Sequence, residues 1–203
     1  MIELEIAENG LWTVTINRPD KANSLTEAML TELAEIAERA GEARGLILTG
    51  AGKVFSAGAD LDEARAGLAI SPVWERLSNA LAAVPCLKVA ALNGTLAGGA
   101  NGMALACDIR IAVPSAKFFY PVMKLGFLPQ PSDAKRMAAL IGPARTKMVL
   151  AAGQKITAQE AYDYGLVDRI VEPEALVETA HDLLAHSLEA KPEIAAGILE
   201  MCR

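Results

Sequence analysis

The sequence predicts an α/β protein in which parallel strands alternate with helices. Short apolar runs typical of buried strands recur along the chain, segments of helical period separate them, and the connections are short. Strands joined in this way pair in parallel through right-handed crossovers. The 203 residues suit one large domain, and a composition of 52% hydrophobic but only 4% aromatic residues predicts a core of Ala, Leu, Val and Ile.

The chain begins with a predicted β-hairpin followed by a helix. Residues 2–6 and 11–16 alternate in polarity on either side of a Glu-Asn-Gly turn. Ser24 and Glu27 have the spacing of a capping box, which predicts a helix that starts there and ends at Gly41.

The next part of the chain contains a predicted buried strand at residues 45–49 and a long glycine loop, GAGKVFSAGADLDE. The loop leads into a short helix, for which Asp60 is the expected cap. A further helix is predicted over residues 71–84, because Pro72 stands at its start and Pro85 at its end.

The stretch VAALNGTLAGGANGMALACDIRIA, residues 89–112, is interpreted as a strand, a tight turn and a helix, followed by another strand. Gly98 and Gly99 open the helix, where the first N–H groups have no intrahelical partner and suit an anion. A simple packing turn would also explain two glycines. The second glycine loop at residues 57–60 favours a ligand site.

The last part of the chain predicts more helices than strands. A Thr157 capping box begins one helix, which stops at Gly165. The other expected elements are strands at 108–113, 117–120 and 166–171 and helices at 132–140, 143–151, 173–188 and 191–203. We predict a core domain over residues 1–172 and a helical appendage over 173–203.

Composition argues against several classes of partner. The formal charge of −6, without Lys/Arg runs, argues against nucleic acid and acidic membrane surfaces as partners. Residues 89–107 are uncharged and almost long enough for a bilayer, but four glycines and two asparagines make them a poor membrane span. The N-terminus has acids where a secretory signal has basic residues.

Cysteine and histidine usage predicts no metal site. Cys86, Cys107 and Cys202 are isolated and odd in number, which argues against disulfides and zinc and favours the reduced cytoplasm. His181 and His186 stand at an offset that does not converge on one metal ion.

Four motifs in order, NRPDKANSLTEAM, FSAGADLDE, NGTLAGGANGMALACDI and ITAQEAYDYGLVDRIV, resemble the crotonase superfamily of enoyl-CoA hydratases and isomerases. The resemblance covers nearly the whole chain. It implies a crotonase-like fold, a spiral of repeated ββα units, here with a truncated C-terminal helical region. It also implies a homo-oligomer, either a trimer or a hexamer.

The resemblance further implies a site for an acyl-CoA, with no cofactor beyond the coenzyme A of the substrate. The N–H groups of Ala59 and Gly99 would form an oxyanion hole around the thioester carbonyl. Fixed donors of this kind stabilise the charge of a thioester enolate. Arg18, Lys21 or Lys53 would lie near phosphates. The residues expected to bind CoA are Lys21, Ala22, Asn23, Leu25, Ala57, Ala59, Asp60, Leu61 and Gly99.

The chain departs from the family where acids and bases are expected. The two glutamates of a hydratase are replaced by Gly102 and Val122, and the acid of many isomerases by Gln130. A carboxamide such as Gln130 cannot act as a general base, although it could hold a carbonyl or carboxylate through hydrogen bonds. Classical hydration is therefore not expected.

Four other polar residues have weaker functional interpretations. Tyr120, Asp133 and Asp62 could reach a pocket, but surface or internally satisfied positions are the simpler interpretation. Ser56 precedes the second glycine loop and has no histidine close in sequence, which argues against a nucleophile.

Two hypotheses about function follow. The first is an acyl-CoA-processing enzyme, an isomerase or lyase that stabilises a thioester enolate with an atypical acid/base; a decarboxylase or hydrolase is a variant of it. The alternative is a non-catalytic acyl-CoA-binding or partner subunit that retains the fold. Missing carboxylates favour the second, and the small residues at both donor positions favour the first.

Overall fold

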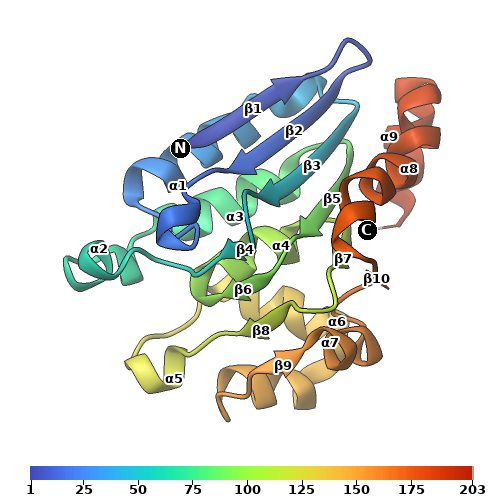
Figure 1. Cartoon of the computed structure of the whole chain (residues 1–203). Helices are drawn as coiled ribbons and strands as arrows, with labels where there is room; N and C mark the ends of the chain where they lie inside the picture. Colours follow the sequence, from blue (N-terminus) through green and yellow to red (C-terminus); the bar gives the residue numbers. More distant parts are fainter. Residues whose placement is uncertain (203) are drawn as a thin grey trace.

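The computed structural model describes residues 1–202 and contains two β-sheets (Figure 1). The larger sheet has the spatial order β1-β2-β3-β5-β7-β10, with β1 (Ile2–Ile6), β2 (Leu11–Ile16), β3 (Gly45–Gly50), β5 (Leu87–Leu92), β7 (Ile109–Ala112) and β10 (Arg169–Ile170). The smaller has the order β4-β6-β8-β9, with β4 (Val54–Ser56), β6 (Thr95–Ala97), β8 (Lys117–Phe119) and β9 (Ile156–Thr157). Only the β1–β2 and β8–β9 pairs are antiparallel among these strands.

The chain repeats one unit in a spiral. The strand pairs β3–β4, β5–β6 and β7–β8 each place their first strand in the larger sheet and their second in the smaller one, and a helical segment follows each pair. Corresponding strands then stack side by side in parallel. This confirms the predicted α/β class and the repeated ββα spiral.

The helices cover the sheets and connect the units. They are α1 (Glu27–Glu38), α2 (Leu61–Arg65), α3 (Val73–Ala83), α4 (Asn101–Ala106), α5 (Val122–Leu125), α6 (Pro131–Leu150), α7 (Ala158–Tyr164), α8 (Leu176–Glu189) and α9 (Pro192–Met201). Single 3-10 turns are η1 (Pro19–Lys21), η2 (Ala40–Glu42), η3 (Leu68–Ile70), η4 (Gly98–Ala100) and η5 (Pro173–Ala175). Helix α3 packs against both α1 and α4.

The C-terminal helices differ in how they attach. Helix α8 packs against β3, β5 and β7 and buries Leu176, Ala180 and Leu184 in the common core. Helix α9 buries no side chain fully and lies beside α8, at the edge of the molecule (Figure 1). The division into residues 1–172 and 173–203 stays a prediction.

The cap of α1 was wrongly predicted. Thr26, not Ser24, is the N-cap, and its hydroxyl accepts a hydrogen bond from the Met29 N–H at 3.2 Å. The Ser24 hydroxyl instead accepts a hydrogen bond from Arg18 at 3.2 Å, and the carboxylate of Glu27 accepts one from Ser71. The predicted capping box therefore loses both of its side chains to tertiary contacts, and α1 ends earlier than predicted.

Several other elements differ from the prediction, among them β6, β10 and α6. Strand β6 was not predicted, because its three residues stand between the turn and the glycine pair. The strand predicted over 166–171 is reduced to β10, since Leu166 and Val167 donate their N–H groups to the Ala161 carbonyl at the end of α7. The two helices predicted around Gly142 correspond to α6, which breaks at this residue with φ +78°.

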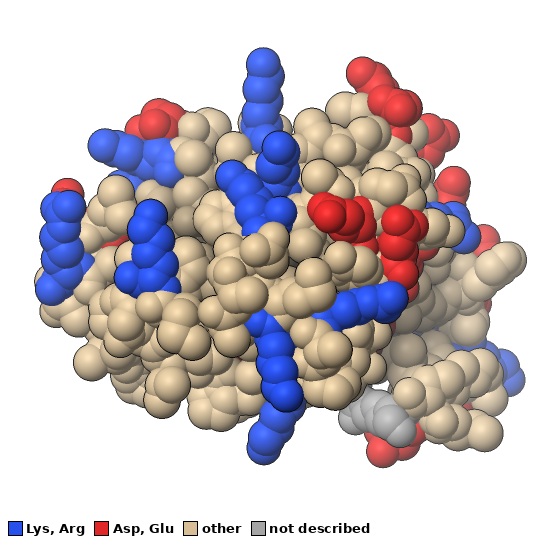
Figure 2. All heavy atoms as spheres, turned by 90° about the horizontal axis from the view of Figure 1, so that it is seen from below, with Lys and Arg blue, Asp and Glu red and all other residues tan. Residues whose placement is uncertain are grey.

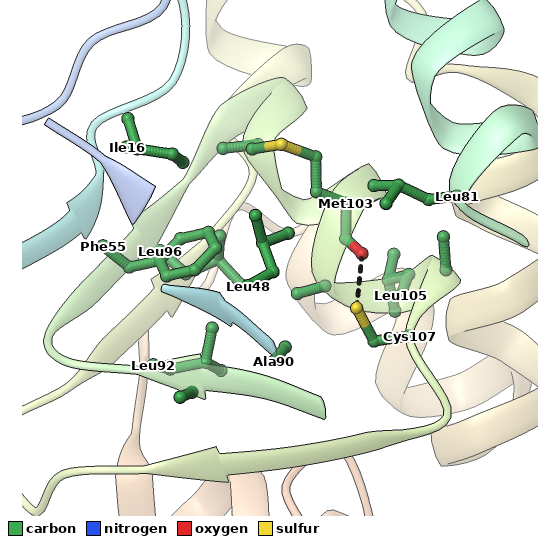
Figure 3. Packing of buried hydrophobic residues seen from close by; sticks show 14 of the residues in the cluster. Ile16, Leu48, Phe55, Leu81, Ala90, Leu92, Leu96, Met103, Leu105 and Cys107 are labelled. Atoms are coloured by element: carbon green, nitrogen blue, oxygen red, sulfur yellow. Dashed lines mark hydrogen bonds between the residues drawn. The ribbon is translucent and has the colours of Figure 1, made fainter. Parts of the chain in front are cut away.

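The core lies between the sheets and the helices. Figure 3 shows Phe55, Leu96 and Leu48 side by side, with Met103 of α4 next to them. The Cys107 thiol donates to the Met103 carbonyl at 3.4 Å. As the composition predicted, aliphatic side chains and alanines dominate this core, and Phe55 and Phe118 are its largest fully buried members.

The surface and the helix lengths bear on possible partners. On the face shown in Figure 2, most Lys and Arg side chains lie over the left and centre with mainly uncharged residues between them, and most acidic side chains lie at the right. Within residues 1–202, none of the helices combines the length and the apolar character needed to cross a bilayer.

Candidate functional site

A cavity of about 430 Å³ lies where the two glycine loops approach one another. Its walls come from α2, α3, the β6–η4 junction, the end of β8, α5 and the loop before α6. Most of the wall is apolar, including Trp74, Phe119, Val122, Leu125 and Phe127. A wall of this kind excludes water and strengthens electrostatic interactions with a few well-placed polar groups.

A larger hollow of about 560 Å³ lies beside α1, α2 and η3. It is more open, and the carboxylates of Glu27 and Glu63 are part of its wall. Both already accept hydrogen bonds, Glu27 from Ser71 and Glu63 from a backbone N–H. Two acids would repel an anionic ligand, so the smaller cavity is the better candidate site.

The glycine loop at residues 57–60 is held by an isolated parallel bridge between Leu25 and Ala59. In this bridge the Leu25 N–H donates to the Gly58 carbonyl and the Asp60 N–H donates to the Leu25 carbonyl, both at 2.8 Å. The Ala59 N–H between them is not used, and in residues 1–202 it has no backbone acceptor. Ala59 lines the cavity, so this donor is available to a ligand there.

The other glycine loop, at Gly98 and Gly99, is the 3-10 turn η4. Gly98 adopts φ +57°, and the amide of Asn101 holds the turn by donating to the Gly98 carbonyl at 2.8 Å and to the Phe119 carbonyl at 3.2 Å. Gly99 provides the second N–H of the turn, which has no acceptor within a helix.

The two loops need glycine for close approach. A Cβ on Gly58, where φ is +91°, would lie 2.9 Å from the Ala97 carbonyl oxygen. A Cβ on Gly99 would lie 2.9 Å from the Trp74 ring. Small residues therefore bring Ala59 and Gly99 to the same cavity, where their N–H groups can donate hydrogen bonds to a carbonyl oxygen that gains negative charge.

Asp60 organises the start of α2 as predicted. Its carboxylate accepts from the Asp62 N–H at 3.1 Å, which makes it the N-cap, and it pairs with Arg18 at 2.7 Å. The hydrogen bond from Arg18 lowers the pKa of Asp60. Arg18 is thus engaged in holding the loop, whereas Arg65 of α2, not singled out from the sequence, lines the cavity.

The structure brings only some of the predicted CoA-binding residues together. Those that line the cavity are Ala57, Ala59, Leu61 and Gly99, and Gln130, predicted as a catalytic residue, lines it too. Asn23 and Leu25 are fully buried outside its wall, and the Asn23 amide donates to the carbonyls of Ala51 and Val54. Ala22 and Asn23 have positive φ angles of 50° and 52°. Lys21 and Lys53 are exposed.

The three positions without the expected acids lie around the cavity. Val122 and Gln130 line it. Gly102 lies behind, in α4, and a Cβ there would stand only 2.6 Å from Oδ1 of Asp133. A carboxylate carried by α6 thus occupies the space next to Gly102.

Asp133 is a buried carboxyl group with one firm partner. It is 1% exposed, and the Tyr120 hydroxyl donates to its Oδ2 at 3.0 Å. Burial raises the pKa of Asp133 to about 6, and Tyr120 and Ser78 offset part of this through hydrogen bonds. Burial, and then the nearby Asp133 charge, raises the pKa of Tyr120, so this phenol stays protonated.

Asp133 and Tyr120 are buried and hydrogen-bonded to one another, so of the two simpler interpretations the internally satisfied position is right for both and the surface position is wrong. Tyr120 also lines the cavity. Asp62, by contrast, is exposed and lies 3.4 Å from Arg65. The contact between Asp133 and Gly102 joins two helices that are far apart in sequence, so no local pattern indicated it.

The remaining candidate groups are structural. Ser56 is buried, and its hydroxyl donates to the Asn23 carbonyl. Burial raises the pKa of the Cys86 thiol to about 11 and that of Cys107 to about 12, so neither is a reactive thiolate. In the described chain, no three His, Cys, Asp or Glu side chains gather to hold a metal ion.

Comparison with known proteins gives one consistent family. The family model described as enoyl-CoA hydratase/isomerase matches residues 6–202. The 1,2-epoxyphenylacetyl-CoA isomerase of Escherichia coli K12 is 33% identical, over 97% of this chain and 79% of its own length. The short-chain-enoyl-CoA hydratase of Clostridium acetobutylicum is 36% identical, over 87% of this chain and 71% of its own.

Solved structures agree in fold. A Magnetospirillum magneticum AMB-1 protein, described as an enoyl-CoA hydratase/carnithine racemase, superposes with a TM-score of 0.91 at 29% identity, covering 100% of this chain and 81% of its own. The enoyl-CoA hydratase of Bacillus anthracis gives 0.86 at 34% identity, covering 96% and 79%.

Proposed function

Because this chain belongs to the enoyl-CoA hydratase/isomerase family, we propose that it binds an acyl-CoA thioester in the 430 Å³ cavity and moves a proton at its α-carbon. One observation carries this proposal. Ala59 and Gly99 both line one apolar cavity, and neither backbone N–H is used by the turn that holds it. Both N–H groups would donate hydrogen bonds to the thioester oxygen as it becomes enolate-like.

The coenzyme arm would follow the loop that carries Ala57 and Leu61, at one side of the cavity. Arg65 is the basic side chain in the cavity wall, which makes it the best candidate for contact with the anionic part of the ligand. Homo-oligomerisation, the cytoplasmic location and the lack of any cofactor beyond coenzyme A stay predictions.

Proton transfer fits this site better than hydration does. A hydratase needs a carboxylate to activate water, and the positions expected to carry one are Gly102 and Val122. The apolar side chain of Val122 lines the cavity and offers no hydrogen bond to water. The names of the relatives include an isomerase and a hydratase, so they do not decide between these reactions.

The proposed donors can be tested with matched ligands that differ only at the carbonyl. We expect butyryl-CoA to bind more tightly than S-butyl-CoA, the thioether that lacks the oxygen. Two hydrogen bonds with net values of about 0.5–1.5 kcal/mol each predict a difference of roughly 5- to 150-fold in Kd. Calorimetry measures both constants, and butyric acid is the control for recognition of the coenzyme arm.

Three outcomes separate the possibilities. Equal affinity for thioester and thioether would refute the oxyanion hole. Binding of butyric acid as tight as butyryl-CoA would refute recognition of the coenzyme arm. Tight thioester binding without any proton exchange would favour the second candidate, a non-catalytic acyl-CoA-binding subunit, which the missing acids at positions 102 and 122 support.

A further inference from the structure

The volume beside Gly102 is filled from another helix. A Cβ on Gly102 would lie 2.6 Å from Oδ1 and 3.1 Å from Oδ2 of Asp133. Such distances leave no room for any side chain at position 102 while Asp133 keeps its place. The carboxyl group of Asp133 therefore stands at the root of the side chain that a hydratase of this family would carry there.

Tyr120 connects this carboxyl group to the cavity. Tyr120 is the residue directly after β8, and it lines the cavity. Its hydroxyl donates a hydrogen bond to Asp133 Oδ2 at 3.0 Å. Asp133 itself is 1% exposed and is not part of the cavity wall. Tyr120 is thus the residue that both lines the cavity and contacts Asp133, which makes its hydroxyl the candidate path for a proton between the two.

The surroundings of Asp133 hold it in place without neutralising it. From α3, the Ser78 hydroxyl stands 3.5 Å from Oδ1, and the charge of Glu75 raises the pKa of Asp133. From α6, Arg136 lowers that pKa, but its guanidinium donates hydrogen bonds to Ser78 and Asn79 and makes no ion pair with Asp133 among residues 1–202.

We propose that Tyr120 and Asp133 form the acid/base of this site, with Tyr120 as the catalytic residue and Asp133 as the proton acceptor behind it. This inference rests on the proposed function, since it needs a thioester in the cavity. It supplies the acid/base that positions 102, 122 and 130 lack.

The step balances as a relay of two protons. The Cα–H bond of the substrate breaks and its proton bonds to Tyr120 Oη, while the proton of Tyr120 passes to Asp133 Oδ2. The electron pair left on the α-carbon delocalises to the thioester oxygen, which the Ala59 and Gly99 N–H groups stabilise. The reverse relay delivers a proton to the α-carbon, giving exchange, or to the γ-carbon of an enoyl chain, giving isomerisation.

The two transfers must be concerted. Because the pKa of Tyr120 is raised, a free phenolate would be too costly to accumulate. Asp133 must be ionised to accept the proton, and its pKa of about 6 allows this at neutral pH. A carboxyl with this pKa is well matched to proton transfer in both directions near neutrality.

The test is deuterium exchange at the α-carbon of butyryl-CoA in D₂O, followed by NMR. Loss of a general acid/base typically costs about 10²–10⁴-fold in rate, so we expect a decrease of this size for Asp133→Asn and for Tyr120→Phe. Affinity for butyryl-CoA, measured by calorimetry, should stay near that of the unmodified protein. Asp182→Asn, at an exposed position of α8, is the control and should exchange normally.

Two readouts separate a relay from a merely structural role. The exchange rate of the unmodified protein should rise with pH through about 6, and Asp133→Asn should lose this rise. The double variant should be no slower than either single variant, because both remove the same relay.

Contrary results overturn the inference in distinguishable ways. Exchange by Asp133→Asn at the unmodified rate and with the unmodified pH profile would refute the pair. Binding of butyryl-CoA without exchange by the unmodified protein would also refute the pair and leave the proposed ligand standing. Absence of binding would refute the proposed function itself.

Discussion

Two parts of the interior contain buried charged side chains, and they differ in how fully these charges are paired. Near β5 and β7, Lys88 and Arg110 are 2% and 3% exposed. The Lys88 ammonium donates to the carbonyls of Val84 and Cys86, both at 3.1 Å, and lies 2.9 Å from a carboxylate oxygen of Asp108. Every donor of this ammonium thus has an acceptor.

Arg110 is satisfied even more fully. Its guanidinium donates to the carbonyls of Leu166 at 2.9 Å, Cys107 at 2.6 Å, Asp108 at 3.1 Å and Ala104 at 3.3 Å, and it lies 3.4 Å from Asp168. These bonds tie β7, the end of α4 and the turn before β10 together. A buried charge with this many partners is part of the architecture.

Asp133 is buried to the same degree but has only hydroxyl partners. Its carboxylate accepts from Tyr120 and Ser78, and no Lys or Arg of residues 1–202 makes an ion pair with it. The comparison teaches that burial of a charge does not by itself indicate a working group. A buried charged group is available for proton transfer where it lacks oppositely charged partners that would fix its protonation state.

The largest expected effect on stability is at Arg110, the fully paired buried charge. Arg110→Met should destabilise the fold by about 3–5 kcal/mol, because it leaves several buried carbonyls without a donor and removes the partner of Asp168. Urea unfolding measures the change. Arg110→Lys should also destabilise, since one ammonium cannot replace the planar fork at all of these carbonyls. An Arg110→Met variant as stable as the unmodified protein would show that the two regions do not differ as described.

The second expected effect is at Asp133, where substitution should raise the stability of the protein rather than lower it. Since burial raises its pKa from 3.8 to about 6, this group contributes stability that is fully present below about pH 4 and is lost as the pH rises through about 6. A difference of about two in pKa corresponds to roughly 3 kcal/mol. Asp133→Asn should therefore be more stable than the unmodified protein at pH 8, by up to that amount.

The same variant should show no advantage at pH 4, where the unmodified carboxyl is protonated in the folded protein. Urea unfolding at both pH values checks this prediction. A stability difference independent of pH would mean that the charge of Asp133 carries no burial cost, and the contrast with Arg110 would disappear.

The third and smallest effect tests the contact between α4 and α6. Gly102→Ala should destabilise by about 1–3 kcal/mol, because the new methyl group would overpack against Asp133. In an Asp133→Ala background the same change should instead stabilise, by up to about 1 kcal/mol, since alanine is the better helix former. A double-mutant cycle from urea unfolding measures the reversal. Additive effects would contradict a direct collision.

Much of the fold could be predicted because its signals are local. Pro72 at the start of α3, the capping box of Thr157, Gly165 at the end of α7 and the cap at Asp60 are all read within a few residues. Short elements were harder to predict from the sequence. Strand β6 has three residues, and its place depends on pairing with β4 and β8 rather than on its own sequence.

The candidate site divides in the same way. The glycine loops around Ala59 and Gly99 follow from motifs, and the structure brings both residues to one cavity. From the sequence, Asp133 was only a weak candidate, because its position depends on how α6 packs against α4. In the sequence, Asp133 is one acid among 25 acidic residues, and only the contact with Gly102 and Tyr120 distinguishes it.

The collision between positions 102 and 133 also limits how such a site can change over generations. With Asp133 in its present position, a side chain at position 102 would occupy the same space, so a glutamate on α4 requires the Asp133 side chain to move or to change. Substitutions at the two positions are therefore coupled, and a reversion at Gly102 alone meets the carboxyl group that now fills its place. The order of substitutions at these two positions becomes part of what the sequence records.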